Sequence, residues 1–220
     1  MENTNQHLES LSEIKNLMER STKFISLSGL SGILAGITAL IGAVFAYFRL
    51  AHYLGAVSLD YATSRSVSEE AMNALTLELI GIALTVLVIS LIAGVILTIK
   101  ETKKNAQSIW DKNSMLLLSN LLIPLGAGGI FSLILIYHNL FVLVAPATLI
   151  FYGLALVNCS KYTISEIRYL GILEIILGLV SAIFVGKGLF FWAIGFGVLH
   201  IIYGTLMHFK YNRNAHPTAG

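Results

Sequence analysis

Six long apolar runs follow one another along the chain, with short polar connections between them. A transmembrane helix needs about 20 mainly apolar residues, so runs of this length leave little room for another fold. We expect the spans at residues 24–48, 74–99, 114–136, 140–158, 169–185 and 189–209. Charged residues make up only 12% of the chain, about half of their share in a soluble domain. The sequence therefore predicts an all-α integral membrane protein built as a six-transmembrane-helix bundle.

Two segments flank the predicted membrane domain of residues 23–210. Residues 1–22 predict a short cytoplasmic amphipathic helix, because apolar residues recur on one face at helical spacing. Its charges are of both signs, so it lacks the basic face of a helix that adsorbs to anionic lipid. Two interpretations stay open: the helix packs on this protein's own cytoplasmic face, or it binds a protein partner. Residues 211–220 form a cytoplasmic tail.

Lysine and arginine are distributed unevenly between the predicted connections. If the N-terminus is cytoplasmic, eleven of them lie inside and three lie outside, namely Arg49, Arg65 and Lys187. Cytoplasmic loops of membrane proteins carry an excess of these residues. We therefore expect both termini in the cytoplasm. The net charge of +2 follows from this bias and does not indicate nucleic-acid binding.

The longest predicted connection, Arg49–Asn73, lies on the outer side. About 25 residues are too few for an independent core, so we expect an ordered cap or a short helical loop. Glu78 lies one turn inside the second span, where the Arg49 side chain can reach it by snorkelling. We expect this interfacial ion pair to be structural.

Glu174 and His200 are the most costly residues of the predicted spans, because each would place an ionisable group in hydrocarbon. Both lie thirteen residues from Lys187 in the last turn (187 − 174 and 200 − 187), which places them at one depth of an antiparallel pair. That depth is roughly 20 Å from the turn. Small residues share the face of each: Gly171, Gly178 and Ser181 for Glu174, and Ala193, Gly197 and Gly204 for His200. We expect the pair to meet inside the bundle.

Four further polar residues in the cytoplasmic half of the bundle are candidate neighbours of this pair: Asn120, Tyr152, Asn158 and Tyr203. One hypothesis is a proton-handling or ligand-binding pocket, in which Glu174 and His200 titrate as a coupled unit. The other is a structural hydrogen bond that locks the last hairpin. The residue pattern leaves both open.

Catalytic and metal-binding signatures are missing from the sequence, including His-Glu-x-x-His, Gly-x-Ser-x-Gly and the phosphate-binding loop. We expect no catalytic residue, no cofactor and no metal, and an enzyme is the less favoured class. The favoured function is a structural or regulatory membrane module that acts through partners. The alternative is a small proton-coupled transporter or solute-binding protein that uses Glu174 and His200. Membrane lipid is an expected partner, and a homo-oligomer is compatible with the sequence.

The last hairpin carries the segments Gly171-Ile-Leu-Glu-Ile-Ile-Leu-Gly178 and Phe191-Trp-Ala-Ile-Gly-Phe-Gly-Val-Leu-His-Ile-Ile-Tyr-Gly204. In these segments the chain resembles small bacterial multi-span membrane proteins and is distantly similar to acid-stress membrane proteins of the HdeD type. The resemblance covers the C-terminal two-thirds of the chain. It implies a helical protein of the bacterial cytoplasmic (inner) membrane and transfers no functional residue.

Overall fold

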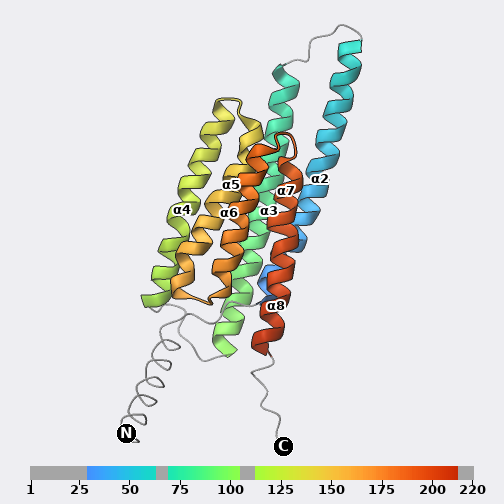
Figure 1. Cartoon of the computed structure of the whole chain (residues 1–220). Coiled ribbons are helices and arrows are strands. Elements are labelled where there is room, and N and C mark those ends of the chain that lie inside the picture. Colours follow the sequence, from blue (N-terminus) through green and yellow to red (C-terminus); the bar gives the residue numbers. More distant parts are fainter. Residues whose placement is uncertain (1–28, 63–68, 105–111, 213–220) are drawn as a thin grey trace, which may run out of the picture.

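The structure, a computed structural model, describes residues 29–62, 69–104 and 112–212, and within these ranges every regular element is a helix. The long helices lie side by side in an elongated bundle (Figure 1). They are α2 (Gly29–Ala62), α3 (Glu69–Lys104), α4 (Lys112–Tyr137), α5 (Val144–Cys159), α6 (Glu166–Ile183) and the rod that begins with the short helix α7 (Gly188–Trp192) and ends with α8 (His200–Asn212). The predicted all-α class is confirmed. The predicted helix of residues 1–22 lies outside the described ranges.

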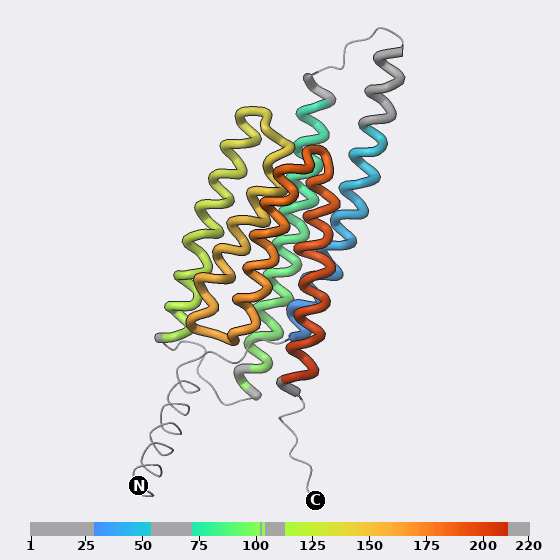
Figure 2. Tube along the Cα trace, in the orientation of Figure 1, coloured from blue at the N-terminus to red at the C-terminus, as the bar shows by residue number. Residues whose placement is uncertain are grey.

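Three short elements complete the chain: the 3-10 helices η1 (Phe141–Leu143) and η2 (Ser160–Tyr162), and the π-helix η3 (Ala193–Leu199). The π-helix joins α7 to α8, so that residues 188–212 form one continuous rod (Figure 2). π-helical turns take in more residues than α-helical turns, and they are rare. This rod therefore departs from the α-helical period within its membrane-length part.

Five segments are long and apolar enough to cross a membrane: Gly29–Tyr53, Met72–Glu101, Asn113–Tyr137, Phe141–Tyr162 and Gly188–Lys210. Each overlaps one of the six predicted spans. The remaining predicted span, residues 169–185, corresponds to α6, which is shorter and carries Glu166, Arg168 and Glu174. All five segments are helical because hydrocarbon offers no partner for backbone polar groups, so each segment must satisfy its own.

The connection after the first span is largely helical, which is one of the two alternatives expected for it, although the helix of the first span ends later than residue 48. The helix α2 continues past Phe48 to Ala62, and α3 begins at Glu69, so much of the expected 49–73 loop is helical. Residues 49–62 contain no proline and several good helix formers, which lets the helix run on beyond the apolar segment. The two tight turns α4–α5 and α6–α7 lie where the sequence predicts them, at Asn139 and Gly186, and both residues have positive φ.

Glycines bring the helices into backbone contact at two crossings. A Cβ atom on Gly204 of α8 would lie 2.6 Å from the Gly29 carbonyl oxygen of α2. A Cβ atom on Gly153 of α5 would lie 2.5 Å from the Gly171 carbonyl oxygen of α6. Close backbone approach of this kind maximises van der Waals contact between helices that gain nothing from hydrophobic exclusion of water. These crossings position α6 and α8 around the polar residues described below.

The predicted face of the last helix is divided between two neighbours. Gly197 and Gly204 pack on α2, where their Cβ positions would meet Leu40 and the Gly29 backbone. The His200 side chain instead points toward α5, where it contacts Tyr152. The small residues predicted to share the His200 face therefore pack on α2, while the imidazole ring reaches Tyr152 of α5 and lies beside Glu174 of α6.

Candidate functional site

The structure brings Glu174 and His200 together inside the bundle. Glu174 lies in the middle of α6, and His200 is the first residue of α8. The distance from Glu174 Oε1 to His200 Nδ1 is 3.5 Å. Glu174 is 0% exposed and His200 is 7% exposed. Each lies thirteen residues from Lys187 in the α6–α7 turn, and the two side chains meet at a common depth of the bundle.

Tyr152 of α5 completes a polar cluster with this pair. Its hydroxyl oxygen lies 2.7 Å from His200 Nε2. On the other side of the ring, His200 Nδ1 lies 2.9 Å from the carbonyl oxygen of Gly195. A carbonyl oxygen can only accept a hydrogen bond, so Nδ1 carries the hydrogen. In a neutral imidazole Nε2 is then an acceptor, and the Tyr152 hydroxyl donates to it.

Glu174 is the member of this cluster whose polar atoms lack hydrogen bonds to the residues that the structure describes. Neither of its carboxyl oxygens has a hydrogen-bond partner among the described residues. The separation of 3.5 Å from His200 Nδ1 is too long for a good hydrogen bond, since that N–H already serves Gly195. A buried carboxylate without donors is very costly, whereas a neutral carboxylic acid is far less so. The geometry therefore fits a Glu174 side chain that holds its proton.

Gly195 is the residue at this site that sequence reasoning missed. A Cβ atom there would lie 2.4 Å from Glu174 Oε2 and 2.5 Å from Leu149 Cδ2. Only glycine leaves room for the carboxyl group, and its carbonyl oxygen also orients the His200 ring. The sequence offers a glycine within an apolar run, which is a common packing signal in membrane helices. It does not reveal that the π-helix turns this glycine toward α6.

Aromatic rings cover the cluster on the side of η3. Phe196 stacks on His200 with ring centroids 6.0 Å apart, and it also contacts Tyr152 at 4.9 Å. Trp192 packs on Phe196 at 5.0 Å. These rings and Leu149 surround the polar atoms with apolar surface. The cluster is thus closed in this conformation, which strengthens every electrostatic interaction inside it.

Asn120 and Asn158 lie together but apart from Glu174 and His200. Pro124 of α4 has no N–H, so the Asn120 carbonyl loses the donor it would have four residues later. Asn158 of α5 supplies a replacement, with its Nδ2 3.2 Å from that carbonyl oxygen. The Asn120 side chain bonds to the Leu116 carbonyl within its own helix, at 2.8 Å. The two asparagines therefore repair a proline interruption, and they are not part of the buried cluster.

Tyr203 also lies outside the cluster. It packs one turn beyond His200 against the buried residues Leu156, Cys159, Ile164, Ile167, Leu170 and Met207. Both ring nitrogens of His200 are engaged by other groups, so Tyr203 is not its hydrogen-bond partner. Tyr203 was expected as a polar neighbour of Glu174 and His200, but in the structure its contacts are packing contacts with apolar residues.

Two ion pairs lie toward the ends of the bundle. Arg49 and Glu78 form a bidentate pair between α2 and α3, with N···O distances of 2.6 and 2.5 Å. Their side chains are 48% and 42% exposed, which fits the interfacial, structural role expected for them. Lys210 of α8 pairs with Glu166 at the start of α6. The second pair was not predicted, because nothing in the sequence indicates that these helix ends meet.

The chemistry available to the cluster is proton binding and transfer. Tyr152, His200 and Glu174 can each carry a transferable proton. The Tyr152 hydroxyl lies at Nε2 of the His200 ring, and the Glu174 carboxyl group lies near Nδ1 on the other side. Within the described ranges, no three His, Cys, Asp or Glu side chains gather closely enough to hold a metal ion. Comparison with known proteins found no matching family model, no matching curated protein and no matching solved structure.

Proposed function

We propose that the chain crosses the bacterial cytoplasmic membrane six times, with α6 as the remaining span. In support, α6 buries Leu170, Gly171, Glu174, Gly178 and Ser181 among the other membrane-length helices. An intramembrane carboxyl group shielded by neighbouring helices is compatible with a span, whereas a lipid-facing one is not.

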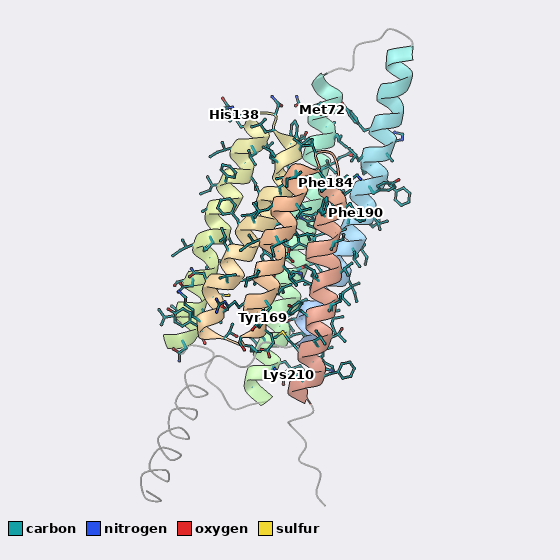
Figure 3. All side chains as sticks on the ribbon, viewed as in Figure 1. Met72, His138, Tyr169, Phe184, Phe190 and Lys210 are labelled. Carbon is teal, nitrogen blue, oxygen red and sulfur yellow. The ribbon has the colours of Figure 1, made fainter. Side chains whose placement is uncertain are left out.

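The proposed orientation places the end of the bundle that carries Lys210 in the cytoplasm. Figure 3 shows Lys210 and Tyr169 toward this end, and Met72 and His138 toward the other. The α5–α6 connection, with Lys161, also lies at the Lys210 end, where α4 begins and α3 ends (Figure 1). The bias of Lys and Arg toward this side supports the assignment.

We further propose that the protein is a regulatory membrane module without catalytic chemistry, whose packing responds to protonation of the Tyr152–His200–Glu174 cluster. The observation that carries this proposal is the fully buried Glu174 carboxyl group without a hydrogen-bond partner among the described residues. A carboxyl group that served only to lock the hairpin would be hydrogen bonded, because an unsatisfied buried polar group destabilises the fold. An unsatisfied group instead favours a role in which its proton is exchanged.

Regulation is favoured over transport because the cluster is sealed. Leu149 and Gly195 pack directly against the Glu174 carboxyl group, and Glu174 has no exposed surface. Transport requires a water-filled path to the binding residue, so it would need a second, open conformation. A regulatory module needs only that protonation changes the relative stability of two packings. The change would then pass to partners, for which residues 1–22 remain the candidate segment.

The test is a double-mutant cycle of Glu174→Gln and His200→Gln, with unfolding in detergent measured from pH 5 to pH 8. We expect a coupling energy of about 1 kcal/mol or more that changes with pH. The matched control is Glu78→Gln, which removes a carboxylate from the exposed ion pair with Arg49. Additive, pH-independent effects of the two substitutions would refute the proposal.

A proton-coupled transporter or solute-binding protein that uses the same pair is the second candidate. The unsatisfied carboxyl group favours it too, since a transported ion or solute could supply the missing hydrogen bonds. Proton flux into liposomes that contain the purified chain distinguishes the two. Flux that is lost in Glu174→Gln would establish transport, and a tight membrane with an intact pH-dependent coupling energy would establish regulation.

A further inference from the structure

A second site lies between α4 and α5. Here α4 and α5 enclose an open groove of about 390 Å³, lined by Pro124, Phe151, Leu154, Val157, Asn158 and Lys161. Its lining is apolar except at the end formed by Asn158 and Lys161.

The groove lies beside Pro124, at a close contact between α4 and α5. The Pro124 ring forms part of the wall, and the bond from Asn158 to the Asn120 carbonyl joins α4 to α5 beside it. Phe151 packs against Gly128 of α4, where a Cβ atom would lie 2.4 Å from the Phe151 Cβ. The groove is thus a fixed feature of the α4–α5 contact.

The length of the groove matches one leaflet of a bilayer. Four residues of α5 line it, Phe151, Leu154, Val157 and Asn158, and Lys161 of η2 continues the same side of the helix. At a rise of about 1.5 Å per residue this face is about 15 Å long, half of the hydrocarbon core of about 30 Å. The apolar end at Phe151 then lies near the middle of the membrane, and Lys161 lies near its surface.

The charge at the surface end selects the headgroup. Lys161 is exposed and forms no ion pair with any residue that the structure describes. A lysine at the cytoplasmic surface attracts anionic lipid headgroups. An apolar groove of leaflet length with a cation at its surface end is complementary to one acyl chain joined to an anionic phosphate headgroup.

We propose that the α4–α5 groove binds an anionic phospholipid of the inner leaflet, with one acyl chain along Phe151, Leu154 and Val157 and the phosphate beside Lys161. This site goes beyond the proposed function and rests only on the membrane orientation given above. Leu154 is 43% exposed, so the chain enters sideways from the bilayer and needs no opening of the bundle.

Native mass spectrometry of the full-length protein in detergent tests the proposal. The probes are phosphatidylglycerol and phosphatidylcholine with identical acyl chains, added in equal amounts. We expect the wild type to retain phosphatidylglycerol in preference to phosphatidylcholine. Lys161→Gln should weaken phosphatidylglycerol binding about fivefold, the effect of one lysine beside an anionic surface, and should leave phosphatidylcholine binding unchanged.

A second variant tests the acyl chain independently of the charge. Leu154→Trp fills the groove and should weaken the binding of both lipids. The matched controls are Lys100→Gln, an exposed lysine at the end of α3, and Ile123→Trp, since Ile123 is 72% exposed on α4 beside Pro124 but outside the groove. Neither control should change lipid retention. Equal retention of the two lipids by the wild type, or loss of retention in the controls to the same extent as in the variants, would overturn the proposal.

Discussion

Asn158 donates a hydrogen bond to the main-chain carbonyl of Asn120, the same carbonyl that Pro124 leaves without its helical donor. One side chain from α5 thus restores a hydrogen bond that α4 cannot make for itself. Such replacement is required in hydrocarbon, where no water can satisfy the carbonyl. The contact also gives a structural role to Asn120 and Asn158, which were predicted from the sequence as neighbours of Glu174 and His200.

This relationship predicts that the cost of losing Asn158 depends on Pro124. Asn158→Leu should lower the free energy of unfolding by about 1 kcal/mol, a typical interhelical hydrogen bond in a membrane protein. In the Pro124→Ala background residue 124 regains an N–H for the Asn120 carbonyl, so Asn158→Leu should cost much less. Unfolding in detergent, run as a double-mutant cycle, measures the difference. Equal costs in both backgrounds would contradict the assignment.

Gly195→Ala should destabilise the protein by about 1–3 kcal/mol, because the added methyl group overlaps the Glu174 carboxyl group. Glu174→Ala removes the overlap with the carboxyl group but leaves the overlap with Leu149 Cδ2, so the double variant should regain part of the loss. Thermal unfolding of the four proteins checks this prediction. Gly126→Ala is the control, since a Cβ atom there meets nothing within 4 Å. A failure of Glu174→Ala to relieve Gly195→Ala would show that the two positions do not touch.

A proton kept on Glu174 in the folded chain contributes stability that falls as the pH rises, because the unfolded chain then binds fewer protons at this group. His200 also titrates in this pH range, so the Glu174 contribution is the difference between the wild type and Glu174→Gln. Glu174→Gln is neutral at every pH and should remove this part of the dependence. The midpoint of unfolding in detergent, followed from pH 5 to pH 8, gives the slope for each protein. Equal slopes of stability against pH in the wild type and in Glu174→Gln would show that Glu174 does not hold a proton in the folded chain.

Gly204→Leu should separate α2 from α8, because a Cβ atom at Gly204 already falls 2.6 Å from the Gly29 carbonyl oxygen and the Ile33 nitrogen. We expect loss of the folded monomer in size-exclusion chromatography. Gly94→Leu is a suitable control, since a Cβ atom at Gly94 meets nothing within 4 Å and the longer side chain can point into lipid. Similar behaviour of the two variants would mean that the α2–α8 crossing is not a close one.

Arg49→Gln should change the free energy of unfolding by no more than about 1 kcal/mol, although its ion pair with Glu78 is bidentate. Both side chains are close to half exposed, so water and salt screen the attraction. Any destabilisation should shrink further at high salt. Chemical unfolding at low and high ionic strength measures this destabilisation. A large decrease in the free energy of unfolding that does not depend on salt would contradict the half-exposed position of the pair.

The sequence was most informative where a single physical requirement decides the structure. Apolar runs of membrane length located the five confirmed segments, because hydrocarbon admits few alternatives to a helix. Glu174 and His200 were expected to meet because both are costly in lipid and lie at the same depth. Arg49 and Glu78 were paired by the same reasoning.

Other features depend on which helices become neighbours, and this is not encoded locally. The glycines of α2 mark a packing face but do not identify α8 as its partner. Gly195 lies in the π-helix η3 and contacts Glu174, and no residue type in this segment predicts a π-helical turn. Lys210 and Glu166 meet only because the ends of α8 and α6 coincide. The first span was predicted to end at residue 48, where its apolar run ends, whereas α2 continues to Ala62 because no proline interrupts the helix.

The crossing of Gly29 with Gly204 also bears on how the protein is made. The first described helix to leave the ribosome finds its close-packed partner in the last one, while α4, α5 and α6 contact their neighbours in chain order. Until α8 has been inserted, the glycine face of α2 is open to lipid or to other nascent helices, and Glu174 lacks the imidazole ring beside it. Translation of the final helix is therefore the step that closes the bundle, and chains stalled before it should be the ones that quality-control proteases remove.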